Sequence, residues 1–129
     1  MADPKKPTEA ELAILRVLWA RGPSTVRDVA EAMDRGGAYT TILKLMQIMT
    51  EKGLIVRDDA SRAHVFEAAY SEDHTQQQLV KDLLDRLFDG SAAKLVMQAL
   101  ATRRASPEEL REIRRVLAGA ERRNAEKKP

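Results

Sequence analysis

The residues whose chemistry is most suggestive lie between Tyr39 and Lys44. Tyr39, Thr40 and Thr41 stand in a row, and Lys44 follows one helical turn after Thr40. Hydroxyl groups can donate hydrogen bonds to bases and phosphates, a threonine methyl group can contact a thymine methyl group, and an ammonium group suits phosphate or guanine. These residue types favour a surface that reads double-stranded DNA, although a polar helix start with Thr40 as its cap would have the same sequence.

Three further residues can extend such a surface. Arg62 belongs to a short polar turn and Arg57 directly precedes it, and their guanidinium groups can contact phosphates and fix the position of a protein along DNA. Another helical pattern, which Ser24 or Thr25 can cap, begins near residue 25, and we expect Thr25 to belong to the same surface. An arginine in a turn, such as Arg62, can also simply be solvated, and the nearby Asp58 and Asp59 weaken its interpretation as a phosphate contact.

Nothing in the sequence supports catalysis or metal binding. The chain has no cysteine, which excludes disulfides, thiolate metal sites and a cysteine nucleophile. The two histidines, His64 and His74, have neither the spacing of a metal site nor a matching set of carboxylates. The sequence also lacks a serine-nucleophile motif, a phosphate-binding glycine loop and a zinc-protease motif. We therefore expect no enzymatic activity, no metal and no cofactor.

The first half of the chain has a pattern that can position these residues. Apolar residues recur every three or four positions in three segments, and two short β-like segments flank the polar turn at 58–62. Thr8 and Thr25 are each followed three positions later by an acidic residue, as in a capping box. The expected elements are helices at about 8–20, 25–33 and 38–52, and strands at 54–57 and 63–67. This order predicts a mainly α fold with a small β-hairpin, namely a winged helix-turn-helix.

The second half of the chain predicts helices only, with more apolar surface than so short a segment can bury alone. We expect these helices to form a dimerisation region, because helix-turn-helix proteins usually read two half-sites; folding back onto the first domain is the alternative. The predicted dimerisation residues are Leu79, Leu83, Leu87, Leu95, Leu100, Leu110, Ile113 and Leu117. The expected organisation is a disordered leader at 1–7, a winged-helix domain at 8–70, a three-helix dimerisation region at 71–120 and a frayed tail at 121–129.

Charge and hydropathy add two expectations. The net charge is +2, and residues 1–70 hold ten basic and ten acidic side chains, so a nucleic-acid partner requires charges sorted onto one face. No apolar run approaches the roughly 18 residues of a membrane span, and the N-terminus lacks the apolar stretch of a signal peptide. We expect a cytoplasmic protein without membrane insertion.

Several segments, in this order, resemble the family of BlaI/MecI-type penicillinase repressors, which includes the CopY-type copper-responsive repressors. They are LAILRVLW (12–19), TVRDV (25–29), YTTI (39–42), EKGLI (51–55), RAHVF (62–66), LLDRLFDGSAAKLV (83–96) and SPEELREIRRVL (106–117). The resemblance implies a homodimeric transcriptional repressor that covers a palindromic operator, typically of a β-lactamase or similar antibiotic-resistance gene. It also implies relief by proteolysis within the dimerisation region, triggered by a membrane sensor–metalloprotease. Tyr39, Thr41 and Lys44 match the recognition helix, and Arg62 matches the wing.

The chain departs from the family pattern at three places. Ile48 stands where an arginine is common, the turn at 58–62 lacks the usual glycine, and the cleavage bond, often Asn–Phe, falls at Gln98–Ala99. The absence of cysteine excludes the copper-sensing mode. Two alternatives stay open: a winged-helix module that binds proteins rather than an operator, and a repressor released by a small ligand.

Overall fold

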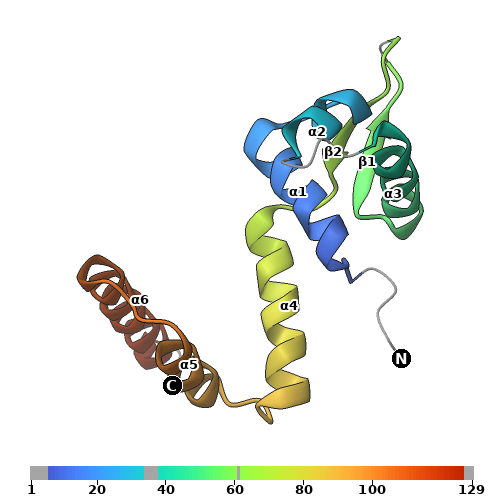
Figure 1. The fold of residues 1–129 in the computed structure, drawn as a ribbon. Coiled ribbons are helices and arrows are strands. Elements are labelled where there is room, and N and C mark those ends of the chain that lie inside the picture. The colour runs from blue at the N-terminus through green and yellow to red at the C-terminus, as the bar shows by residue number, and fades with distance from the viewer. Residues whose placement is uncertain (1–5, 34–37, 61, 127–129) are drawn as a thin grey trace. The chain divides into compact units, whose positions relative to one another are not determined.

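The computed structural model describes residues 6–33, 38–60 and 62–126. They belong to two compact units, one ending at Asp82 and the other beginning at Leu83, and each unit is described by itself. Figure 1 shows the elements of both along the chain. The described part of the first unit contains helices α1 (Glu9–Arg21), α2 (Val26–Ala32) and α3 (Tyr39–Lys52), strands β1 (Ile55–Asp58) and β2 (Val65–Ala68), and the start of α4 (Glu72–Leu87).

The first unit is a winged helix, which confirms the predicted fold class. α2 and α3 form the helix-turn-helix, and β1 pairs with β2 in an antiparallel hairpin in which Ile55 lies opposite Ala68 and Asp58 opposite Val65. We call this hairpin with its turn, residues 55–68, the wing. The loop before α2 joins the wing through Ser24, whose backbone exchanges hydrogen bonds of 2.9 and 2.8 Å with the backbone of Phe66. The wing is thus attached to the loop between α1 and α2.

The helix ends follow from the sequence. Thr8 and Thr25 both form complete capping boxes, with Glu11 and Asp28 as their respective partners, as predicted. α3 ends at Gly53, which has the left-handed conformation with φ 80° and donates its backbone N–H to carbonyl groups in the last turn. The turn from α3 into β1 is therefore fixed by a residue without a side chain.

The core of the first unit lies between the helices and the inner face of the wing. The buried apolar residues are Ile14, Leu15, Leu18, Val26, Val29, Ala30, Ile42, Met46, Met49, Leu54, Ile55 and Phe66. Next to this core the carboxylate of Glu11 is buried and lies 2.7 Å from Nζ of Lys52. Burial favours a raised pKa, but the hydrogen bonds from Lys52 and Thr8 outweigh it and lower the pKa of Glu11.

The boundaries of the predicted regions differ from the structure at three points. The first unit extends to Asp82 rather than Tyr70, because the Trp19 indole donates a hydrogen bond to the Tyr70 carbonyl and Thr75 is buried in α4. Lys6, which we placed in a disordered leader, forms an ion pair of 2.9 Å with Asp82. Residues 1–5 and 127–129 lie outside the described residues.

The third difference concerns the last helix. α6 runs through Glu126, whereas we ended it near Ala120 and predicted a frayed tail. Residues 121–126 consist of Glu, Arg, Asn and Ala, most of which are good helix formers, so nothing in this segment stops the helix.

The described part of the second unit is helical, as expected. It holds the end of α4, then α5 (Ala92–Thr102) and α6 (Pro107–Glu126). Ser91 caps α5 by accepting a hydrogen bond from the backbone of Lys94, and Ser106 accepts one from Glu109 at the start of α6. Among the described residues after Thr75, none is buried.

Candidate nucleic-acid interface

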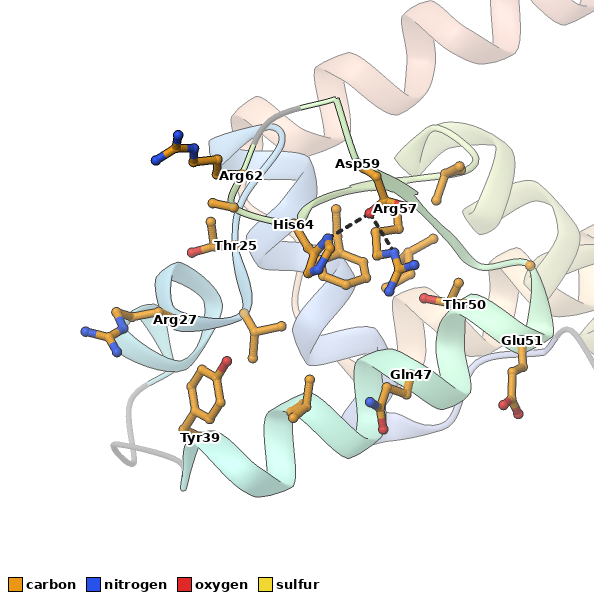
Figure 2. A pocket seen from close by; sticks show the side chains of 17 residues that line it. Thr25, Arg27, Tyr39, Gln47, Thr50, Glu51, Arg57, Asp59, Arg62 and His64 are labelled. Carbon is orange, nitrogen blue, oxygen red and sulfur yellow. Dashed lines mark hydrogen bonds and ion pairs between the residues drawn. The ribbon is translucent and has the colours of Figure 1, made fainter.

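An open groove lies between α3 and the wing, and the start of α2 adds to its wall (Figure 2). From α3, the groove is lined by Tyr39, Leu43, Gln47 and Thr50, whose spacing of four, four and three places them on one face of the helix. The wing supplies the opposite wall with Arg57, Asp59, Arg62, Ala63 and His64, among others. The described elements of the first unit thus gather polar side chains from three separate segments at one surface.

Four of the seven predicted DNA-binding residues line this groove: Thr25, Tyr39, Arg57 and Arg62. Thr40, Thr41 and Lys44 are exposed on α3 but are not part of its lining. Helical periodicity places Thr40 and Lys44 on one stripe with Gln47 and Glu51, which themselves line the groove. It places Thr41 further round the helix near Ile48. The groove, which has both apolar and polar side chains, and the exposed residues of α3 next to it together form the candidate interface.

The start of α3 excludes the interpretation that Thr40 caps this helix. The N-cap position is Ala38, which has no side-chain cap, and Thr40 lies inside the helix rather than at its cap. Within the described residues, the Thr40 and Thr41 hydroxyl groups have no hydrogen-bond partner, unlike Thr50, whose hydroxyl donates to the Met46 carbonyl at 2.8 Å. The hydroxyl groups in the first turn of α3 therefore remain available to a ligand.

Thr25 has a structural role that still leaves a donor available. Its side-chain oxygen accepts a hydrogen bond from the backbone of Asp28, and its own backbone N–H donates to the Asp28 carboxylate at 3.1 Å. Hydrogen bonds from Thr25, first its backbone and then its side chain, lower the pKa of Asp28. The hydroxyl hydrogen of Thr25 can still point to a ligand in the groove.

The two predicted arginines of the wing have different surroundings. Nε of Arg57 lies 2.9 Å from Oδ1 of Asp59, and the same oxygen lies 2.7 Å from Nδ1 of His64. Figure 2 shows Arg57 and His64 turned toward Asp59, whereas Arg62 extends away from this cluster at another part of the groove. The sequence indicated that Asp58 and Asp59 weaken the case for the arginine in the turn, Arg62, whereas in the structure Asp59 pairs with Arg57.

Two groove residues did not emerge as site residues from the sequence. Arg27 is exposed in the first turn of α2 and lines the groove beside Thr25. Gln47 is on the outward face of α3, and a glutamine amide can form paired hydrogen bonds with adenine. The helical spacing of Gln47 from Tyr39 and Leu43 could have identified it from the sequence. Arg27 follows a helix cap by two positions, and no sequence pattern distinguishes it from other surface arginines.

The predicted dimerisation residues lie on helices that are largely exposed. Leu83, Leu87, Leu100 and Leu117 are exposed by 41, 68, 41 and 58%, and Leu79, Leu95, Leu110 and Ile113 are half-buried. The bond between Gln98 and Ala99 lies inside α5, where both residues are exposed and the Thr102 hydroxyl donates to the Gln98 carbonyl at 2.6 Å. None of the predicted dimerisation residues is fully buried among the residues that the structure describes.

Other kinds of site find no support in the described segments. Within residues 6–33, 38–60 and 62–126, acidic and histidine side chains nowhere gather in threes where they could hold a metal ion. The described helices include none that is both long and apolar enough to cross a bilayer.

Comparison with known proteins links most of the chain to one group of regulators. The model of the family described as penicillinase repressor matches residues 7–119. The Mycobacterium tuberculosis protein named transcriptional regulator BlaI is 30% identical over 116 residues, which cover 88% of this chain and 83% of that protein. These values are the same for the BlaI protein of the CDC 1551 strain and for that of the H37Rv strain.

The solved structures that this chain resembles have lower sequence identity to it. The crystal structure of M. tuberculosis Rv0081 is 15% identical with a TM-score of 0.48, and the match covers 67% of this chain and 84% of that one. The crystal structure of an ArsR family transcriptional regulator is 22% identical with a TM-score of 0.46, covering 64% and 86% of the respective chains.

Proposed function

Because the chain belongs to the penicillinase repressor family, we propose that it is a homodimeric repressor that binds a palindromic operator in double-stranded DNA. The family and the mycobacterial relative are transcriptional regulators and not enzymes, and this chain is a transcriptional regulator of the same kind. The observation that carries the proposal is the groove beside α3, which brings together the polar side chains of Thr25, Tyr39, Arg57 and Arg62.

The proposed DNA complex follows from the chemistry of α3. Its first turns carry hydroxyl groups and Lys44 on exposed positions, which suits the edges of bases in a major groove. Arg62 of the wing and Arg27 of α2 line the groove beside this helix surface and suit the flanking phosphates. In this arrangement Tyr39, Thr40 and Gln47 read sequence, whereas Lys44 and Arg62 fix the register.

The proposal of a homodimer rests on unpartnered apolar side chains. Leu87, Met97 and Leu117 are each exposed by more than half, and no described residue after Thr75 is buried. A helical segment without a fully buried apolar residue gains little hydrophobic stabilisation of its own, so it needs a partner surface. A second copy supplies a self-complementary partner, and its two-fold symmetry demands an operator with matching symmetry.

We also propose that repression ends when the dimerisation region is cut. The bond between Gln98 and Ala99 is exposed on α5, but a protease that binds an extended chain must first unfold part of this helix. Cleavage there separates α6 from the DNA-binding unit and removes its share of the dimer surface. The protease expected from the family resemblance is a membrane sensor–metalloprotease, and the expected target is a β-lactamase-type or related operon.

One observation favours a second candidate function, a winged helix that binds proteins rather than an operator. Asp59 pairs with Arg57 in the groove and reduces the positive charge that phosphates would meet. This candidate predicts weak duplex binding without dependence on the residues of α3.

Salt dependence of duplex binding distinguishes the two functions. We expect the logarithm of the affinity to fall linearly with the logarithm of salt concentration, with a slope of about 0.9 for each phosphate neutralised. Lys44→Ala should make this slope shallower by about 0.9 per subunit. Arg16→Ala is the matched control, because Arg16 is exposed on α1 and does not line the groove. Absence of duplex binding at low salt, or equal effects of both substitutions, would contradict the proposal.

A further inference from the structure

The turn of the wing brings Asp59 into contact with two side chains of the groove, Arg57 and His64. Oδ1 of Asp59 lies 2.9 Å from Nε of Arg57 and 2.7 Å from Nδ1 of His64 (Figure 2). The side chains are each about half exposed, by 53% for Asp59, 49% for Arg57 and 59% for His64, and all of them line the groove. A ligand in the groove therefore meets these side chains together rather than a free arginine.

The ion pair changes what Arg57 can offer to DNA. The Nε–H group that donates to Asp59 is not free to donate to a phosphate oxygen. If Arg57 contacts the DNA backbone, either this ion pair breaks or the Asp59 carboxylate comes close to a phosphate of the same charge. Both events cost binding free energy on every duplex, because phosphates are common to all sequences.

We propose that Asp59 is a positioning residue that withholds Arg57 from the DNA backbone and restrains the affinity of the protein for any duplex. This inference rests on the proposed function, since it concerns the same surface. The wing then depends on Arg62 for its phosphate contact, and binding by the groove is weaker than the number of its arginines suggests. The restraint acts on the sequence-independent part of binding, which electrostatic contacts dominate.

The neighbouring acidic residue provides a matched control. Asp58 does not line the groove, and its Oδ1 accepts a hydrogen bond of 2.9 Å from the backbone of Ala60 within the turn. Asp58→Asn and Asp59→Asn each remove one negative charge from the wing and keep an oxygen acceptor in place. Only Asp59→Asn removes the ion pair with Arg57. A difference in duplex affinity between the two variants therefore reports on this ion pair and not on the net charge.

The first test measures binding of the full chain to a fluorescent duplex of random sequence at several salt concentrations. We expect Asp59→Asn to bind up to about fivefold more tightly than the unmodified protein, the range typical of an exposed ion pair. Its salt dependence should be steeper by about 0.9 per subunit, since Arg57 becomes free to neutralise a phosphate. Asp58→Asn should give a smaller gain and leave the salt dependence unchanged. Thermal unfolding of each variant checks that the wing is retained.

A double-mutant cycle then tests whether the gain passes through Arg57. Arg57→Ala should lower duplex affinity less in the unmodified protein than in Asp59→Asn, and the double variant should lose the gain. Equal gains in Asp58→Asn and Asp59→Asn, or a gain that persists without Arg57, would overturn this inference while duplex binding itself still supports the proposed function. If the unmodified chain binds no duplex at any salt concentration, the proposed function fails and this inference fails with it.

Discussion

Tyr39 occupies the position where the start of α3 meets the groove, and its ring is about half exposed there, at 49%. The hydroxyl group can donate to a base edge, and the ring can pack against the sugar or a thymine methyl group. We expect Tyr39→Phe to lower affinity for a specific operator by about 1–3 kcal/mol and to change affinity for random DNA much less. Competition binding with both duplexes measures this difference.

Thr40→Ala, like Tyr39→Phe, should lower affinity for the operator more than affinity for random DNA. Arg62→Ala should lower affinity for operator and random DNA by similar factors. A Tyr39→Phe variant that loses as much affinity for random DNA as for operator would show that Tyr39 contacts the backbone and not a base.

Glu11 gives a prediction for stability against pH. Its carboxylate is buried beside Lys52, and its pKa is lowered, so its contribution is present at neutral pH and lost as the pH falls through its folded pKa. Glu11→Gln should lower the free energy of unfolding at pH 7 by about 1–3 kcal/mol, because Lys52 loses its charged partner. The difference should shrink as the pH falls below roughly 4.3, the ordinary pKa of glutamate.

Denaturant unfolding of both proteins across this pH range measures the effect. Glu67→Gln serves as the control, because Glu67 is exposed on β2. A difference between the unmodified protein and Glu11→Gln that stays constant from pH 7 to pH 3 would show that the ion pair contributes nothing.

At the scale of elements, the junction between α3 and β1 depends on Gly53. Its φ of 80° is unfavourable for residues with a Cβ atom, although no atom lies within 4 Å of the position that a Cβ would occupy. Gly53→Ala should therefore destabilise the protein by about 1–2 kcal/mol through backbone strain alone. Gly53→Asn should cost less, because asparagine tolerates the left-handed conformation. Thermal unfolding ranks the three proteins, and equal stability of all three would contradict this account of the turn.

The elements could be predicted from local signals, whereas the contacts between them could not. Thr8 and Thr25 cap the helices at the predicted places because a capping box depends on residues three positions apart. The pairing of Glu11 with Lys52 joins residues far apart in the chain, and periodicity contains no information about it. The same holds for the choice of Asp59 over Asp58 as the partner of Arg57, which depends on how the turn directs each side chain.

At the scale of the whole molecule, the two units should have separate roles. The unit ending at Asp82 contains the described core and the groove, and the unit after it has exposed apolar helices. A chain that ends at Asp82 should remain folded but monomeric. Its operator affinity should fall by about 10²–10⁴-fold, since two linked heads gain effective concentration that one head lacks.

Sedimentation and operator binding of the shortened and full chains test this separation. Leu117→Glu in the full chain is a second test, because it places a charge on an exposed apolar position of α6 without shortening the protein. A full chain that sediments as a monomer at micromolar concentration would contradict the proposed dimer.

The most direct test of the central claim is selection of duplexes from a random-sequence pool by the full-length protein. If the chain is a dimeric regulator that reads DNA through α3, the selected sequences should share an inverted repeat. The centres of its half-sites should lie about 10 base pairs apart or a multiple of that spacing, because both copies must meet the same face of the helix. A selected pool without an enriched motif, or with a single asymmetric motif, would contradict the account.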